Sequence, residues 1–380
     1  VSGGSASENG TQQVTISITE KALNSGTQLT YNSSDADTRK GLAEFTNFNI
    51  NGGSSTLNPL EKINAHKAVG YGLTGNGQTV AIMDSGFNTS HSDVSNVTFS
   101  TYGTINNSTS GSYHGSTVTG IIAADQDGGA SLVGISPNVD VLLTDYQGNS
   151  GGSFSPTNWA LATAAATSAE AVVQNNSWGF DQQYGANSSS QPARIDDLVS
   201  YMNSNSVTGA ETLVHYQSID KDSNGVFDVG VGTSERTWSV ANWNDYVDKL
   251  NTFQTKGVVV FALSNDNNAG DADISAGLPE LFSQLQEAWI NTVNIQQTGS
   301  TGATWTLQSA PCGSTAEYCL GADGTNITGM AHGNAYVLNT TGSSFAAPQV
   351  SAAVAIMAEA FPNMTPEQWT DRLLASANNT

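Results

Sequence analysis

The sequence predicts an α/β protein of three layers, in which helices cover both faces of a mostly parallel central sheet. Short apolar runs, rich in Val and Ile, alternate with Ala-rich stretches of helical length. Several of these runs end in polar side chains, as expected where buried parallel strands reach the functional edge of an open sheet. The length of 380 residues leaves ample volume for such a core.

The first chemically informative strand covers residues 79–83 and ends in Asp84-Ser85-Gly86. This run predicts a buried parallel strand that delivers a carboxylate at its C-terminal end. Thirty residues later, His114 begins an apolar stretch of small residues over 114–124, which predicts a helix. Gly115 and Gly120 allow that helix to pack closely.

Further strands are expected at 139–143, 171–176, 257–263 and 290–295, with helices at 156–169, 195–202 and 242–256. The strand at 257–263 leads to Ser264-Asn265. The carboxamide of an asparagine at a strand end is able to donate an N–H to an oxyanion.

Near the C-terminus, residues 342–348 read Gly-Ser-Ser-Phe-Ala-Ala-Pro and lead into an Ala/Val-rich helix. A serine at a helix N-terminus lies beside free backbone N–H groups, and the helix dipole there favours developing negative charge. Ser344 is therefore a candidate nucleophile, and an N-capping serine is the alternative. The order Asp84, His114, Ser344 is one of the known orders of a catalytic triad.

From about residue 57 to the C-terminus, these four motifs resemble those of the subtilisin family of serine proteases (subtilases), in the family's order. The resemblance implies a subtilisin-like fold. It also implies that Asp84 orients His114, that His114 is the general base and that Ser344 is the nucleophile. Asn265 would then contribute to the oxyanion hole.

The resemblance also implies where a peptide binds. Residues 175–179 would pair with the substrate as an added antiparallel strand. The implied substrate-binding residues are Ser177, Trp178, Gly179, Ala262, Leu263 and Ser264. Trp178 would then lie near the rim of the specificity pocket, and a core tryptophan is the alternative.

We therefore expect a secreted serine endopeptidase that hydrolyses peptide bonds through an acyl-enzyme. A catalytically degenerate subtilase-fold module for binding or adhesion is the alternative. All four motif positions being filled favours the enzyme.

The net charge and hydropathy of the chain limit the classes of partner that it is expected to bind. The chain has 33 Asp and Glu against 11 Lys and Arg, a net charge of −22, which disfavours binding to nucleic acid. No run of 18 apolar residues is present, so no membrane span is expected. We expect a monomer with a peptide or protein substrate, secreted or at the cell surface of a bacterial-type source, whose signal peptide has been removed.

The two cysteines, Cys312 and Cys319, lie seven residues apart with a glycine between them. A disulfide between them is favoured over two free thiols and would indicate an oxidising compartment. The block around them, and residues 175–179, also resemble the subtilase passenger domains of bacterial autotransporters.

A calcium loop is predicted at residues 220–228. The expected ligands are the side chains of Asp220, Asp222, Asn224 and Asp228 with the carbonyl of Val226, in EF-hand spacing. Position 12 of the pattern is Val231 rather than glutamate, so the loop departs from the full motif. A solvated acidic turn is the alternative.

Two regions lie outside the expected core. Residues 1–56 are rich in Ser, Gly, Asn and Thr, and the alternation at 14–18 predicts a polar, β-rich extension. Residues 57–380 are expected to form the catalytic domain, with an insertion at about 180–256 that carries the calcium loop.

Overall fold

The computed structural model describes residues 29–48, 58–106, 113–129, 131–146, 154–179, 194–217, 238–298 and 304–377. The strands are β1 (Thr79–Asp84), β2 (Phe99–Tyr102), β3 (Asp140–Asp145), β4 (Val173–Asn176), β5 (Val258–Ala262), β6 (Trp289–Thr298), β7 (Thr304–Leu307), β8 (Cys319–Ala322), β9 (Ile327–Met330) and β10 (Tyr336–Thr340). The α-helices are α1 (Ser33–Gly41), α2 (Ala43–Asn47), α3 (Pro59–Lys62), α4 (Ala65–Gly70), α5 (His114–Ala123), α6 (Pro156–Ser168), α7 (Ile195–Asn205), α8 (Gly209–Gln217), α9 (Val240–Phe253), α10 (Leu278–Leu281), α11 (Ser343–Ala360) and α12 (Pro366–Ser376). Short 3-10 turns lie at Ser92–Val94 (η2), Ser283–Leu285 (η3) and Gly313–Tyr318 (η4).

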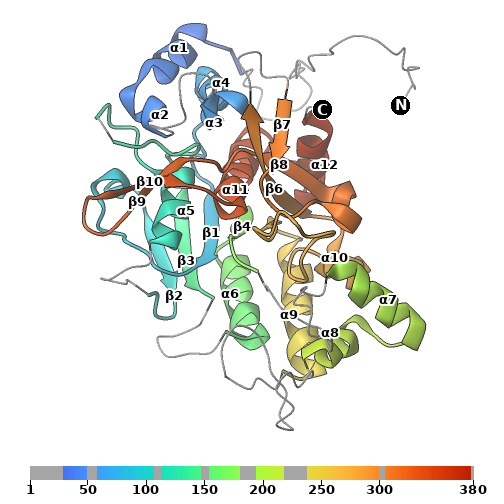
Figure 1. Ribbon diagram of the computed structural model, residues 1–380. Coiled ribbons are helices and arrows are strands. Elements are labelled where there is room, and N and C mark those ends of the chain that lie inside the picture. The colour runs from blue at the N-terminus through green and yellow to red at the C-terminus, as the bar shows by residue number, and fades with distance from the viewer. Residues whose placement is uncertain are drawn as a thin grey trace.

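The central sheet has the strand order β2-β3-β1-β4-β5-β6-β7, and β8 also pairs with β6 (Figure 1). The pairs from β2 to β6 and the β6–β8 pair are parallel, while β7 is antiparallel to β6. The chain leaves β1 on one side to form β3 and continues on the other side with β4. Parallel strands of this kind bring their carboxyl ends to one edge, and ligands bind there at such a switch in strand order.

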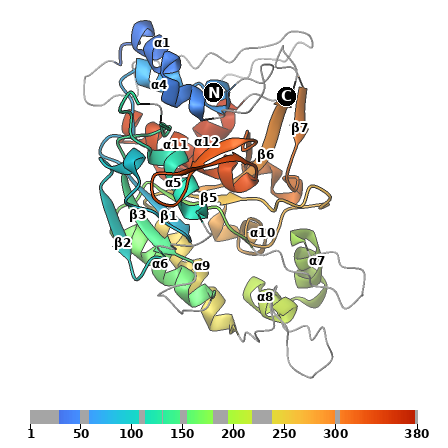
Figure 2. The same cartoon turned by 60° about the vertical axis from the view of Figure 1, so that its left-hand side comes forward.

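Helices cover both faces of this sheet. Figure 2 separates α5 and α11 on one side of the sheet from α6 and α9 on the other. The first pair shares one buried cluster with β1 and β3, and the second pair shares another buried cluster with the opposite face. The expected three-layer α/β/α fold is confirmed, and α9, expected within the insertion, packs beside α6 as part of a helix layer.

Local signals explain where the main helices begin. Ser155 caps α6 by accepting a hydrogen bond from the N–H of Asn158, and Pro156 occupies the first turn. Reciprocal capping boxes start α9, with Ser239 and Asn242, and α12. Because these signals are local, α6 and α9 were predicted within a few residues.

The described part of the N-terminal extension corrects the expectation of a β-rich segment. Residues 33–47 form α1 and α2 rather than strands. The side chain of Asn32 accepts a hydrogen bond from the N–H of Ser34 and so caps α1. The polar composition hid these helices because few of their residues are apolar, and the strand expected at 14–18 lies outside the described residues.

The same two helices dock onto the core of the α/β fold through the loop that follows α5. Arg39 donates to the carbonyl oxygen of Gly134 at 2.7 Å, and the carboxylate of Glu44 accepts the N–H of Gly128 at 3.0 Å. Phe45 and Phe48 are buried in the cluster that contains α5 and β1. Residues 33–48 are therefore a built-in part of the core.

The outer parts of the chain are spread over two ends of the molecule. Figure 1 shows α1 and α2 at the opposite end from α7 and α8, which belong to the expected insertion.

Cys312 and Cys319 form a disulfide that spans η4 and leads directly into β8. No helix in the described ranges has both the length and the apolar character needed to cross a membrane.

Candidate active site

Asp84 and His114 meet where β1 ends and α5 begins. The two carboxylate oxygens of Asp84 lie 2.8 and 3.0 Å from Nδ1 of His114. A backbone N–H also donates to this carboxylate, from Ser85 to Oδ1 at 2.7 Å. The imidazole is thus held by an oriented carboxylate, and the Asp–His half of the expected triad is assembled.

The first turn of α5 is tied to the loop that follows β1. The N–H of Gly115 donates to the carbonyl oxygen of Ser85 at 2.8 Å, and both the N–H and the hydroxyl of Ser116 donate to the carbonyl oxygen of Gly86. A Cβ atom at position 115 would lie 2.9 Å from the Ser85 oxygen and closer still to the Phe87 ring. This approach therefore requires glycine.

The environment sets the protonation of His114. Asp84 is only 1% exposed, while the His114 side chain keeps 35% of its surface exposed. Burial alone lowers the pKa of His114, but the charge and hydrogen bond of Asp84 outweigh it and raise the pKa above its usual value. A histidine with one face open and a raised pKa is suited to accept and return a proton.

Ser344 is the second residue of α11 and is partly exposed. Its hydroxyl donates to the carbonyl oxygen of Ser177 at 3.1 Å, and among the described residues no hydrogen bond joins it to His114. The ring of Phe345 lies 5.5 Å from the His114 ring, which brings the start of α11 beside the imidazole. Hydrogen bonds of this kind often tighten only when substrate binds.

Pro348 explains a second link between α11 and β4. Proline has no N–H, so the usual helical hydrogen bond to the carbonyl oxygen of Ser344 is missing. The hydroxyl of Ser177 donates to that oxygen instead, at 2.9 Å. Ser177 and Ser344 are therefore joined by two reciprocal hydrogen bonds.

Asn265 lies next to the same helix start. Its Oδ1 accepts the N–H of Ser343 at 2.9 Å and the Ser343 hydroxyl at 3.0 Å. Because a backbone N–H only donates, this contact fixes Oδ1 toward Ser343 and turns Nδ2 away from it. Within the described part of the chain, no hydrogen bond uses that Nδ2.

A pocket of about 140 Å³ opens beside Ser344. All six residues expected to bind substrate line it, together with the candidate nucleophile, the candidate oxyanion donor and two further residues: Ser177, Trp178, Gly179, Ala262, Leu263, Ser264, Asn265, Asp273, Ser343 and Ser344. Trp178 also contacts the buried rings of Trp159 and Phe261, so it serves both the pocket wall and the core. We call this cavity the Ser344 pocket.

Asp273 is the pocket residue that sequence reasoning missed. Nothing in the sequence shows that the loop after Asn265 turns back toward Gly179, so Asp273 was not expected in the pocket. The expected calcium loop at 220–228 lies outside the described residues. Within the described ranges, no group of three or more His, Cys, Asp or Glu side chains is arranged to hold a metal ion.

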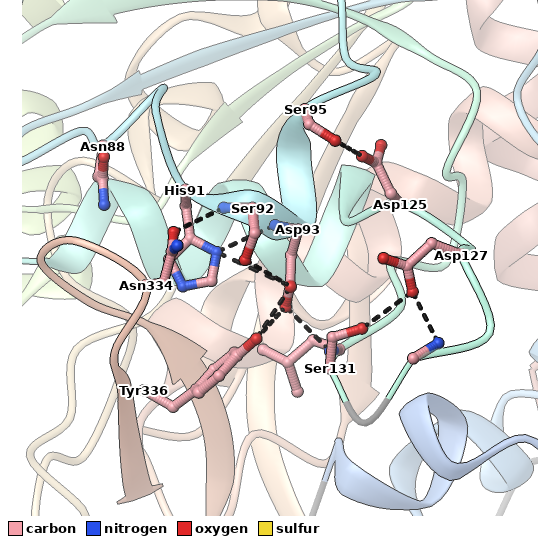
Figure 3. Close-up of polar contacts among 12 residues, drawn as sticks. Asn88, His91, Ser92, Asp93, Ser95, Asp125, Asp127, Ser131, Asn334 and Tyr336 are labelled. Atoms are coloured by element: carbon pink, nitrogen blue, oxygen red, sulfur yellow. Dashed lines mark hydrogen bonds and ion pairs between the residues drawn. The ribbon is translucent and has the colours of Figure 1, made fainter.

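A second histidine–aspartate pair, His91 and Asp93, is buried next to Tyr336 of β10 (Figure 3). His91 Nδ1 accepts the N–H of Asp93 at 3.1 Å, and Nε2 lies 3.1 Å from the carbonyl oxygen of Ala335. The Asp93 carboxylate accepts the Tyr336 hydroxyl at 2.8 and 2.9 Å and the N–H of Leu132. His91 Nδ1 accepts a hydrogen bond from the backbone N–H of Asp93, so it does not donate one to the Asp93 carboxylate. The carboxylate instead binds the Tyr336 hydroxyl and so attaches β10 to the core, which indicates a structural role for this pair.

Comparison with known proteins places these features in a family. A model of the subtilase family matches residues 75–380. An extracellular serine protease of Serratia marcescens is 26% identical over 351 residues, which is 81% of this chain and 30% of that protein. The chain thus spans less than a third of the length of this relative.

Solved structures agree on the fold. Sphericase superposes with a TM-score of 0.53 at 17% identity, covering 87% of this chain and 88% of its own. Fervidolysin from Fervidobacterium pennivorans, described as a keratinolytic enzyme related to subtilisin, gives a TM-score of 0.51 at 18% identity over 83% of this chain and 42% of its own. The narrower likeness to autotransporter passengers stays a prediction. Because the family model covers most of its length, the chain belongs to the subtilase family of serine proteases.

Proposed function

We propose that the chain is an active extracellular endopeptidase in which Asp84, His114 and Ser344 form the catalytic triad. The observation that carries this proposal is the Asp84–His114 hydrogen bond, together with a serine in the first turn of α11 that lines a pocket. Membership of the subtilase family supports the same chemistry. The competing adhesion module has no use for a histidine held by a buried carboxylate.

In the proposed mechanism, Oγ of Ser344 attacks the carbonyl carbon of the scissile peptide bond while His114 takes its proton. Asp84 keeps the proton on Nδ1, so that Nε2 is the acceptor, and it stabilises the imidazolium. His114 then protonates the leaving amine, and water hydrolyses the acyl-enzyme by the reverse sequence.

In this mechanism two N–H donors bind the oxyanion. The backbone N–H of Ser344 is one of the free groups of the first turn of α11, where the helix dipole also favours negative charge. Nδ2 of Asn265 is the second, because Oδ1 of the same carboxamide is held by Ser343. Such preorganised donors stabilise the tetrahedral intermediate.

Action outside the cell is supported by two independent features. The Serratia relative is described as extracellular, and Cys312 and Cys319 are joined in a disulfide. Disulfides persist mainly in oxidising compartments.

Replacing Ser344 by alanine tests the nucleophile directly. Ser344→Ala should lower kcat/KM for a peptide substrate by about 10⁴-fold or more, since the acyl-enzyme no longer forms. Far-UV circular dichroism and Tm should stay unchanged. Ser204→Ala, an exposed serine on α7, is the matched control and should retain full activity. Substantial turnover by Ser344→Ala would refute the assignment.

The pKa of His114 gives a second test. Because Asp84 raises this pKa, kcat/KM should increase with pH through a value above the ordinary 6.5 as the imidazole loses its proton. Protonated His114 stabilises the fold fully below the pKa of the unfolded chain, and this contribution is lost as the pH rises through the folded value. Asp84→Asn removes the charge, so the His114 pKa should fall.

That shift is measured by NMR titration of the histidine ring signals, carried out on a Ser344→Ala background to prevent autolysis. Asp245→Asn, an exposed carboxylate on α9, should leave the His114 signal unchanged. An unaltered His114 titration in Asp84→Asn would mean that Asp84 does not control the imidazole.

We further propose that calcium binds the loop at 220–228. The carboxylate and amide oxygens of Asp220, Asp222, Asn224 and Asp228 are ligands that calcium prefers, and the support for this site is the sequence alone. A chelator should lower Tm by roughly 5 °C, as expected for loss of a bound ion at saturating calcium. Asp222→Asn should remove this dependence, and Asp248→Asn should not. Equal sensitivity in both variants would locate the ion elsewhere.

A further inference from the structure

Asn175 is a polar residue among apolar neighbours on the central sheet. It lies on β4 between Ile82 of β1 and Val260 of β5, and all three residues are fully buried. Successive side chains of a strand point to opposite faces, so Asn175 shares a face of the sheet with Val173, which packs in the same cluster as α11. A carboxamide in such a place costs stability unless both of its groups are hydrogen-bonded.

The partners of Asn175 form a chain of hydrogen bonds that ends on the candidate nucleophile. Nδ2 of Asn175 donates to Oγ of Ser177 at 3.0 Å, and the Ser177 hydroxyl donates to the carbonyl oxygen of Ser344 at 2.9 Å. At the other end, Oδ1 of Asn175 accepts the hydroxyl of Ser351 at 2.9 Å. The chain thus leaves α11 at Ser351, passes the end of β4 and returns to α11 at Ser344.

The direction of every bond in this chain follows from its last acceptor. The carbonyl oxygen of Ser344 can only accept, so the Ser177 hydroxyl gives its proton to that oxygen. The lone pairs of Ser177 Oγ are then left for Nδ2 of Asn175, and Oδ1 of the same carboxamide faces the Ser351 hydroxyl. Turning the carboxamide over would break both of its bonds. The chain is therefore satisfied in one arrangement only, which makes it rigid.

The chain joins two points of α11 that lie on either side of Pro348. Ser344 and Ser351 are two helical turns apart, roughly 10 Å along the axis, which places both on the face that meets β4. Pro348 removes the helical hydrogen bond to the Ser344 carbonyl oxygen, so the first turn of α11 lacks that internal support. The sheet supplies the support instead, because Asn175 holds Ser177 Oγ at this oxygen.

From these contacts we infer that Asn175 and Ser351 are positioning residues for the nucleophile, and that they act on Ser344 through Ser177. The inference rests on the proposed peptidase function and adds residues that support the reaction from inside the core. Neither side chain is exposed, so neither touches a substrate. Both keep the first turn of α11 at the end of β4, where the hydroxyl and the N–H of Ser344 stay aligned on the substrate carbonyl.

Alanine at position 351 tests the far end of this chain of hydrogen bonds in the full protein. Ser351→Ala removes the donor to Oδ1 of Asn175, and it should lower kcat for a fluorogenic peptide about threefold or more while KM changes less than about twofold. The pH at which kcat/KM increases should stay the same, since the contact of His114 with its carboxylate is untouched. Ser136→Ala is the matched control and should keep its kcat, because Ser136 is equally buried and its hydroxyl donates to the carbonyl oxygen of Ile122 at 3.0 Å.

A double-mutant cycle separates positioning from general support of the core. Ser177→Ala cuts the chain next to Ser344 and should lower kcat about tenfold. Because Ser351 acts through Ser177, adding Ser351→Ala to this variant should lower kcat by less than about twofold more. Asn175→Asp keeps the shape of the side chain but removes the Nδ2 donor, so its kcat should match that of Ser177→Ala. If Asn175→Asp does not fold, the cycle tests the chain without it. A loss from Ser351→Ala that persists in full on the Ser177→Ala background would overturn the inference.

A fluorophosphonate label, applied to each protein, separates failure of this inference from failure of the proposed function. We expect Ser351→Ala to label at Ser344 more slowly than the unaltered chain, and Ser136→Ala to label at the same rate. Equal labelling and equal kcat in Ser351→Ala and Ser136→Ala would overturn the inference and leave the peptidase standing. An unaltered chain that neither takes up the label nor cleaves any peptide would instead remove the proposed function, and the positioning role with it.

Discussion

The geometry of the site depends on the hydrogen bonds between the first turn of α5 and the loop that follows β1. Gly115 and Ser116 donate to the carbonyl oxygens of Ser85 and Gly86, and this contact sets His114 against the carboxylate at the strand end. Any side chain larger than hydrogen at position 115 would push the helix away. Because an Asp–His hydrogen bond tolerates little displacement, the position of the His114 imidazole is set by the packing of the end of β1 against the start of α5.

A second set of contacts positions Ser344, the proposed nucleophile, and it depends on a proline inside α11. Pro348 frees the carbonyl oxygen of Ser344, and the hydroxyl of Ser177 binds it. This links α11 to the end of β4, where the proposed peptide-binding segment begins. Asn265, at the end of β5, holds the N–H of the preceding Ser343. Three strand ends and two helix starts therefore converge because parallel strands share one functional edge.

Sequence predicted the parts of this arrangement that local rules determine. Residues 79–83 and 257–263 are continuous apolar runs because parallel strands are buried on both faces, so the polar residues at their ends were conspicuous. Helices α1 and α2 were wrongly expected as β-rich, since they are held by docking through Arg39 and Phe45 rather than by an apolar stripe of their own. The pocket position of Asp273 was missed for a related reason: its loop is shaped by hydrogen bonds to backbone groups that no residue pattern reveals.

The central claim is that Ser344 is activated by the Asp84–His114 pair in the native fold. Its most direct measurement is reaction of the intact chain with a fluorophosphonate at neutral pH, followed by peptide mapping by mass spectrometry. We expect a single adduct, on Ser344, and none on denatured protein, where the triad is lost. Native protein that takes up no label, or that carries it on Ser343 instead, would contradict the account.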